Sequence, residues 1–108
     1  MQLGAAALIG LVLWVAYGGG YVSLDAMWSL AWGRDLVAAA PLAQSGTTTP
    51  HVLSNLIGAV LSPLGADADR GLVAVEFLAA GGLVWLTGLL AREVAGLAAG
   101  ITAGVLMA

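Results

Sequence analysis

The residues able to do chemistry are few, and most of them gather between residues 23 and 69. Asp25 comes first, with Trp28 and Trp32 close behind it. At a membrane surface the reduced dielectric makes an aspartate a stronger general base, so Asp25 is a candidate catalytic residue. An aspartate at the start of a helix also serves as its N-cap for backbone reasons alone. The residue types leave both roles open.

Arg34 and Asp35 follow about nine residues after Asp25. On a regular helix Asp35 projects within roughly a quarter-turn of Asp25, whereas Arg34 points to the opposite side. The planar guanidinium of an arginine suits a phosphate, so Arg34 and Asp35 are candidate substrate-binding residues. The alternative, which the residue types favour, is a solvated pair that anchors the helix at the lipid headgroups.

His51 follows Pro50, and Asn55 comes one turn later on the same helical face. A histidine at a helix start can donate to a phosphate or move a proton, so both residues are candidate substrate-binding residues. A lone histidine is more often an ordinary surface residue. Glu76 lies in an otherwise apolar segment, where it either faces a cavity or extends to the membrane interface.

The apolar segments that must position these residues have the length of membrane spans. Residues 1–22 and 70–91 each exceed the roughly twenty apolar residues that a span needs, and residues 94–108 resemble the start of a third span. We expect Asp67 or Asp69 to cap the second span and Arg92-Glu93 to mark its exit. Residues 1–22 lack the basic start of a signal peptide, so we expect a retained span.

The connection over residues 23–69 is too long for a simple link, so we expect structure in it. Ser23 or Asp25 can cap a short helix that runs to about Ala40 and is closed by Pro41. A second short helix is predicted over about residues 51–61, and Pro63-Leu64-Gly65 should end it. The two tryptophans and the apolar second helix indicate that both lie along the membrane surface.

The composition fits lipid better than water. Of the 108 residues 61% are hydrophobic and 8% are charged, whereas soluble domains carry roughly 25% charged residues. The absence of cysteine excludes disulfide and thiol chemistry, and the net charge of −3 argues against nucleic acid as a partner. The predicted fold is an all-α integral membrane protein with two full transmembrane helices, a truncated third, and two short surface helices in a long first external loop.

The order of these features resembles a known enzyme family. The motifs are, in chain order, Asp25 directly after the first span, Trp28-Ser29-Leu30-Ala31-Trp32-Gly33-Arg34-Asp35-Leu36, then Thr49-Pro50-His51-Val52-Leu53-Ser54-Asn55-Leu56, and Leu61-Ser62-Pro63-Leu64-Gly65. This pattern resembles the N-terminal portion of the polytopic glycosyltransferases of the C superfamily, which include protein O-mannosyltransferases and aminoarabinose transferases. Ala26 stands where the mannosyltransferases commonly have a second acidic residue.

The resemblance implies a function and a location. It implies transfer of a sugar, with inversion, from a polyprenyl-phosphate donor to an acceptor hydroxyl. Asp25 would be the catalytic base, and Arg34 and His51 would stabilise the departing phosphate. A divalent metal ion is left open as a cofactor. The implied location is a bacterial plasma membrane with a cytoplasmic N-terminus and the loop of residues 23–69 outside.

The remaining alternative is a small non-enzymatic membrane subunit or a transporter fragment. Gly96, Gly100 and Gly104 recur every four residues and predict a bare helix face that packs against another helix. On the enzyme interpretation the chain is a fragment, inactive alone, and its partners are membrane lipid and the remaining helices of the same protein. The positive charges of the connecting segments do not determine the orientation in the membrane. The long connection holds Arg34 and Arg70 and the short one after the second span holds Arg92, so the two counts are nearly equal.

Overall fold

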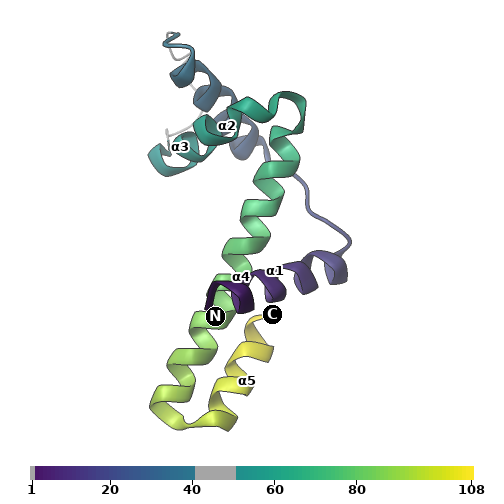
Figure 1. Ribbon diagram of the computed structural model, residues 1–108, viewed down its shortest axis with the longest axis vertical. Helices are drawn as coiled ribbons and strands as arrows, with labels where there is room; N and C mark the ends of the chain where they lie inside the picture. The colour runs from purple at the N-terminus through teal and green to yellow at the C-terminus, as the bar shows by residue number, and fades with distance from the viewer. Residues whose placement is uncertain (1, 41–50) are drawn as a thin grey trace. The chain divides into compact units, whose positions relative to one another are not determined.

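The computed structural model describes residues 2–40 and 51–108, and all the regular structure in these ranges is helical. The elements are α1 (Gln2–Tyr17), α2 (Leu24–Val37), α3 (Val52–Leu61), the 3₁₀ helix η1 (Ser62–Asp67), α4 (Ala68–Ala95) and α5 (Leu97–Met107). Figure 1 shows their order along the chain. The predicted all-α class is confirmed. The predicted Thr/Pro-rich stretch and the closing Pro41 lie outside the described residues.

The chain divides into two compact units. The hairpin unit consists of Met1–Gly20 and Val75–Ala108, and the crossing unit consists of Tyr21–Ala74. Of the described residues, one helical stretch, Val52–Ala95, which joins α3, η1 and α4, is long and apolar enough by length and composition to cross a membrane. The apolar helices Leu3–Tyr17 and Leu97–Met107 are shorter.

Helix α1 ends at Tyr17, earlier than the predicted boundary at residue 22. Gly18 and Gly19 have positive φ angles of 72° and 96°, a conformation that glycine adopts without steric cost. The amide of Gly19 donates to the carbonyl of Trp14 at 3.1 Å, which is the six-to-one bond of a Schellman cap. The glycine run therefore terminates the helix instead of loosening its last turn.

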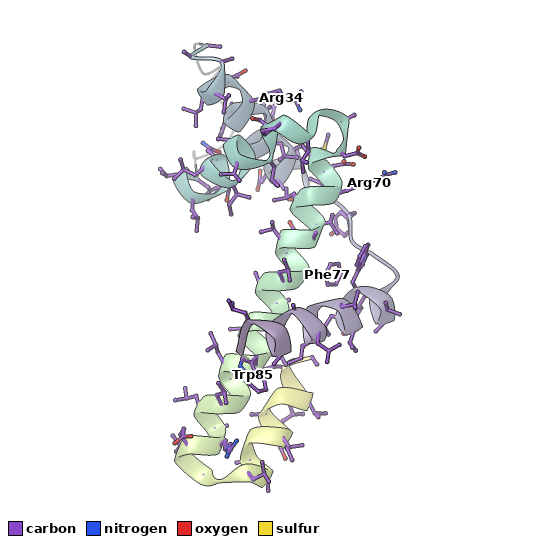
Figure 2. The ribbon with its side chains drawn as sticks, in the orientation of Figure 1. Arg34, Arg70, Phe77 and Trp85 are labelled. Carbon is purple, nitrogen blue, oxygen red and sulfur yellow. The ribbon has the colours of Figure 1, made fainter. Side chains whose placement is uncertain are left out.

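Glycines bring the helices of the hairpin unit close together. A Cβ on Gly10 of α1 would lie 2.6 Å from the carbonyl oxygen of Phe77, and one on Gly81 of α4 would overlap the backbone of Ala6 and Gly10. These contacts place α1 across α4, as Figure 2 shows beside the labelled Phe77. Each position requires glycine because the two backbones touch there.

Helix α4 runs through Arg92-Glu93 and ends at Ala95, so the helix continues past the pair predicted to mark its exit from the membrane. The turn falls at Gly96, whose φ of 86° stops α4 and starts α5. A Cβ on Gly100 would lie 2.8 Å from both the Cβ of Arg92 and the carbonyl oxygen of Gly88. The glycine face predicted to need another helix is thus covered, at Gly100, by α4 of the same chain.

The crossing unit is built around two short helices that touch through glycine. A Cβ on Gly33 of α2 would overlap the backbone of Gly58 and Ala59, and one on Gly58 of α3 would overlap the carbonyl of Ser29. Beside this contact lies a small apolar core in which Leu30, Ala68 and Leu72 are buried. Val22, Ala26, Ile57 and Leu61 pack around it.

The boundaries of the two short helices follow local signals. Ser23 is the N-cap of α2, and its hydroxyl accepts a hydrogen bond from the amide of Ala26 at 3.2 Å. Helix α3 starts after His51, and η1 follows it across Pro63 to a break at Gly65, where φ is 59°. Asp67 lies before α4 and binds Arg70 at 3.0 Å, while Asp69 lies in the first turn.

Candidate functional site

Asp25 lies in the first turn of α2 and its side chain is exposed. The capping position belongs to Ser23, so the prediction that Asp25 itself caps the helix is wrong. A carboxylate in the first turn still interacts favourably with the partial positive charge of the helix N-terminus. The backbone carbonyl of Asp25 accepts a bond from the buried hydroxyl of Ser29 at 3.1 Å. The carboxylate itself is free to meet solvent or a substrate.

Arg34 and Asp35 lie in the last turns of the same helix. Arg34 is exposed, and Asp35 is half-buried. Asp25 and Asp35 are ten residues apart on one helix, which corresponds to roughly 15 Å along its axis. The nine-residue spacing on the regular helix α2 places Arg34 on the side opposite Asp25. One bound sugar cannot touch all three groups unless the substrate reaches along the helix.

His51 and Asn55 flank the start of α3 and have different environments. His51 is at the N-cap position, exposed, and makes no capping bond with its side chain. The backbone N–H of Asn55 donates to the backbone carbonyl of His51 at 2.9 Å, which is the first bond of the helix. Asn55 is buried on the face of α3 that also carries Gly58. His51 and Asn55 therefore lie one helix turn apart, as predicted, but one side chain is exposed and the other is buried.

The described structure gives the five candidate residues a common scaffold but no direct bonds. Within residues 2–40 and 51–108, no side-chain hydrogen bond or ion pair joins any two of Asp25, Arg34, Asp35, His51 and Asn55. Asp25 lies one turn before Ser29 on α2, and His51 lies two turns before Gly58 on α3. The contact between Gly33 and Gly58 thus fixes where α2 crosses α3, and Asp25 and His51 lie on the turns before this crossing.

Two polar atoms buried in this unit lack partners among the described residues. They are the indole nitrogen Nε1 of Trp32 and the amide oxygen Oδ1 of Asn55. An unpaired buried polar group lowers the folding stability by about 1–3 kcal/mol, so Trp32 and Asn55 each reduce the stability of this unit. The rings of Trp28 and Trp32 lie 6.0 Å apart at 35°. Sequence reasoning used Trp32 only as a membrane-surface signal, and nothing in its spacing revealed the unpaired indole nitrogen.

The described residues offer no metal centre. No group of three or more His, Cys, Asp or Glu side chains in residues 2–40 and 51–108 is arranged to hold a metal ion. Glu76 of α4 is exposed in the hairpin unit. No protein-family model, no curated protein and no solved structure matches this chain.

Proposed function

We propose that this chain is the N-terminal part of an integral membrane glycosyltransferase that resembles the C superfamily. The proposed reaction transfers a sugar from a polyprenyl-phosphate donor to an acceptor hydroxyl. The observation that carries the proposal is the order of the elements. An apolar helix is followed, after a six-residue link, by an exposed aspartate at the start of a short helix, then by a second short helix, and then by two apolar helices.

The exposed apolar surface supports the membrane part of the proposal. Large apolar side chains of all three helices of the hairpin unit are exposed, and Figure 2 shows mostly carbon along α4 and α5. They include Leu3, Leu8 and Val15 of α1, Leu83, Leu86 and Leu90 of α4, and Leu97, Val105 and Leu106 of α5. Exposed apolar surface on this scale belongs against lipid or another protein.

The length of α4 fits the same proposal. The 28 residues of α4 extend roughly 42 Å, which is enough to cross a hydrocarbon core of about 30 Å. The 16 residues of α1 extend roughly 24 Å and lie across α4, so the length argument for a full span applies to α4 alone. Tyr17 and Tyr21 follow at its end, where aromatic rings suit the headgroup layer.

In the proposed reaction Asp25 is the base. Its carboxylate takes the proton of the acceptor hydroxyl as the oxygen attacks the anomeric carbon on the face opposite the phosphate. The bond from that carbon to the phosphate oxygen breaks, and the polyprenyl phosphate leaves with the electron pair, so the configuration inverts. The exposed side chains of Arg34, a cation, and His51, a hydrogen-bond donor, are proposed to stabilise the negative charge that grows on the departing phosphate.

The proposal predicts that Asp25→Asn lowers turnover by about 100-fold or more, because a positioned general base contributes about 10²–10⁴-fold. The measurement is sugar transfer from a radiolabelled polyprenyl-phosphate donor in membranes that contain the complete gene product. The same change should cost only about 0.3–1 kcal/mol of stability, since it removes a charge from a helix N-terminus. Thermal unfolding in detergent separates the two effects.

The matched control is Asp69→Asn. Asp69 is also an exposed aspartate in the first turn of a helix, but it belongs to α4. It should keep wild-type turnover and lose a similar small amount of stability. If Asp25→Asn retains full turnover, Asp25 is not the base. If both variants lose activity equally, the loss comes from helix stability and not from the chemistry of Asp25.

A further inference from the structure

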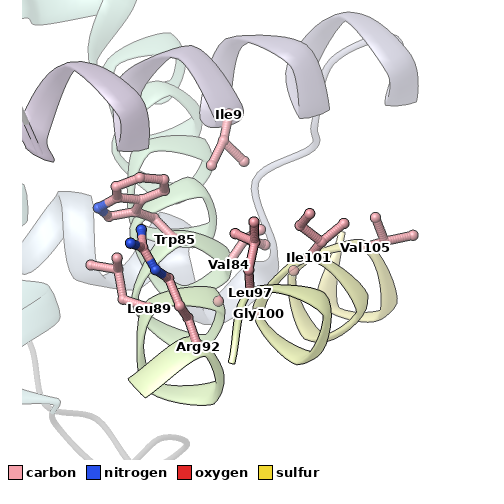
Figure 3. Close-up of a pocket in the computed structure, with 11 residues that line it drawn as sticks. Ile9, Val84, Trp85, Leu89, Arg92, Leu97, Gly100, Ile101 and Val105 are labelled. Carbon is pink, nitrogen blue, oxygen red and sulfur yellow. The ribbon is translucent and has the colours of Figure 1, made fainter. Parts of the chain in front are cut away.

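A half-open cavity of about 310 Å³ lies in the hairpin unit, lined by residues of α1, α4 and α5. Its volume is at the lower end of the roughly 300–1,000 Å³ typical of ligand pockets. Figure 3 shows Ile9 of α1 facing the side chains of α4 and α5 across this space. The apolar lining is formed by Ile9, Val84, Leu89, Leu97, Ile101 and Val105. Gly88, Gly100 and Gly104 line the part of the cavity where α4 and α5 come close together.

The polar side chains of this lining, Trp85 and Arg92, both come from α4. Trp85 contributes the face of its indole ring, whereas its Nε1 is buried and does not open into the cavity. Arg92 comes seven residues later, so it projects on the same face two turns further along. Side chains on a helix tilt toward its N-terminus, and Figure 3 shows the guanidinium of Arg92 extending toward Trp85. The lining contains no carboxylate.

This arrangement selects an anion that carries a hydrocarbon chain. A guanidinium without an acceptor favours a negatively charged group, and it matches the oxygens of a phosphate with paired hydrogen bonds. Apart from this guanidinium the lining is apolar, which favours an alkyl chain over a sugar or a nucleotide. Arg92 makes no ion pair with any residue in the described ranges.

The direction of the cavity matches a lipid in a bilayer. Arg92 lies near the C-terminal end of α4, roughly 36 Å along the axis from Ala68, and Val84 lies about 12 Å back toward the middle. If α4 spans the membrane, Arg92 is at the headgroups and Val84 is in the hydrocarbon core. A headgroup at Arg92 would therefore have its chain running inward along Leu89 and Val84.

We propose that this cavity binds one acyl chain of an anionic phospholipid, with the lipid phosphate at the guanidinium of Arg92. The site rests on the proposed insertion of the chain in a membrane, and it lies within the hairpin unit. It goes beyond the proposed sugar transfer, because the ligand is a structural lipid and not the sugar donor.

The experiment uses the full chain in nanodiscs of phosphatidylcholine. Trace phosphatidylglycerol or trace phosphatidylcholine with a diazirine on one acyl chain is added, and the cross-linked residues are located by mass spectrometry. We expect the phosphatidylglycerol probe to label residues 84–105 about fivefold more than the phosphatidylcholine probe. One arginine near a membrane is worth about 1 kcal/mol toward anionic lipid, which is about fivefold in occupancy.

Two substitutions test the two halves of the site. Arg92→Gln should abolish the preference for phosphatidylglycerol without removing the label, because it deletes the charge and keeps the cavity. Gly104→Leu should reduce labelling by both probes, because a Cβ there meets no neighbour within 4 Å and the longer side chain fills the cavity. Gly82→Leu is the matched control, since Gly82 of α4 has equally open space but does not line the cavity.

The outcomes separate this proposal from the one that it rests on. Equal labelling by both probes in wild-type nanodiscs, or equal loss of label in the Gly82 and Gly104 variants, overturns the lipid site and leaves membrane insertion standing. Equally strong labelling by a diazirine fatty acid shows that the site takes a carboxylate as readily, and overturns the assignment to phospholipid. A chain that stays soluble without nanodisc or detergent overturns insertion and the lipid site together.

Discussion

At the scale of single residues, Ala39 is the one non-glycine in the described ranges with a positive φ, at 50°. It follows α2 in the position where a Schellman cap places a left-handed residue. The amide of Ala40 donates to the carbonyl of Asp35 at 2.9 Å, and the amide of Ala39 donates to that of Leu36 at 3.2 Å. Glycine adopts this conformation without the steric cost that a Cβ brings.

We therefore predict that Ala39→Gly stabilises the protein by about 0.5–1 kcal/mol. Ala38→Gly is the control, because Ala38 has a right-handed helical φ of −78° and should lose about as much as Ala39→Gly gains. Reversible unfolding in detergent, followed by circular dichroism, gives both values. A destabilised Ala39→Gly variant together with an unchanged Ala38→Gly variant would show that α2 does not end in this cap.

At the scale of the elements, the contact between α2 and α3 depends on glycine. A Cβ on Gly58 would overlap the carbonyl of Ser29, so Gly58→Ala must push the helices apart. Overpacking of this kind costs about 1–3 kcal/mol, which exceeds the gain of about 0.5–1 kcal/mol in helix propensity. We predict net destabilisation, together with a change in the near-ultraviolet circular dichroism of the Trp28–Trp32 pair, which lies on α2.

Gly82→Ala isolates the propensity effect. Gly82 is in the interior of α4, and a Cβ there meets nothing within 4 Å. This variant should be more stable than the wild type by about 0.5–1 kcal/mol and leave the tryptophan signal unchanged. A Gly58→Ala variant that behaves in the same way would contradict the close crossing of α2 and α3.

The same helices show what the sequence can predict. Glycine and proline act through the local backbone, so the run at Gly18 and the segment around Gly65 mark real breaks. Ser23 was one of two residues proposed as the cap of α2, because a cap depends on neighbouring residues alone. Arg92-Glu93 predicted an exit from the membrane and not a helix end, and the residue that turns the chain is Gly96, whose positive φ favours glycine.

Tertiary contacts account for what the sequence missed. The glycine face of α5 predicted a partner helix, but its spacing carries no information about which helix this is, and the hairpin supplies α4. For the candidate site the sequence predicted the helices that carry Asp25 and His51. It did not predict that Asn55 is buried while His51 is exposed, because that depends on where α2 crosses α3.

At the scale of the whole molecule, the charges of α4 divide between its ends. Asp69 and Arg70 lie in the first turn, Arg92 and Glu93 lie near the last turn, and Glu76 is the one ionisable residue between these pairs. From Phe77 to Ala91 the helix has no charged residue over 15 positions, which is roughly 22 Å. A span with this distribution would hold its two ends in the two headgroup layers.

The absence of cysteine from the chain allows a direct test of this topology. We predict that, in intact cells, a membrane-impermeant maleimide labels Ala66→Cys, whose position is exposed just before α4. Val94→Cys, exposed near the end of α4, should react only after the cells are opened. Leu83→Cys, in the middle of α4 and also exposed, should react in neither condition and only after solubilisation, because lipid covers it.

The three positions separate the possible failures. The wild-type chain, which has no thiol, gives the background. Labelling of Leu83→Cys in opened cells at the rate of Val94→Cys would mean that water reaches the middle of α4, and the membrane span would be refuted. Labelling of Val94→Cys but not Ala66→Cys in intact cells would keep the span and reverse its direction. Asp25 would then face the cytoplasm, and an external site of sugar transfer at Asp25 would be ruled out.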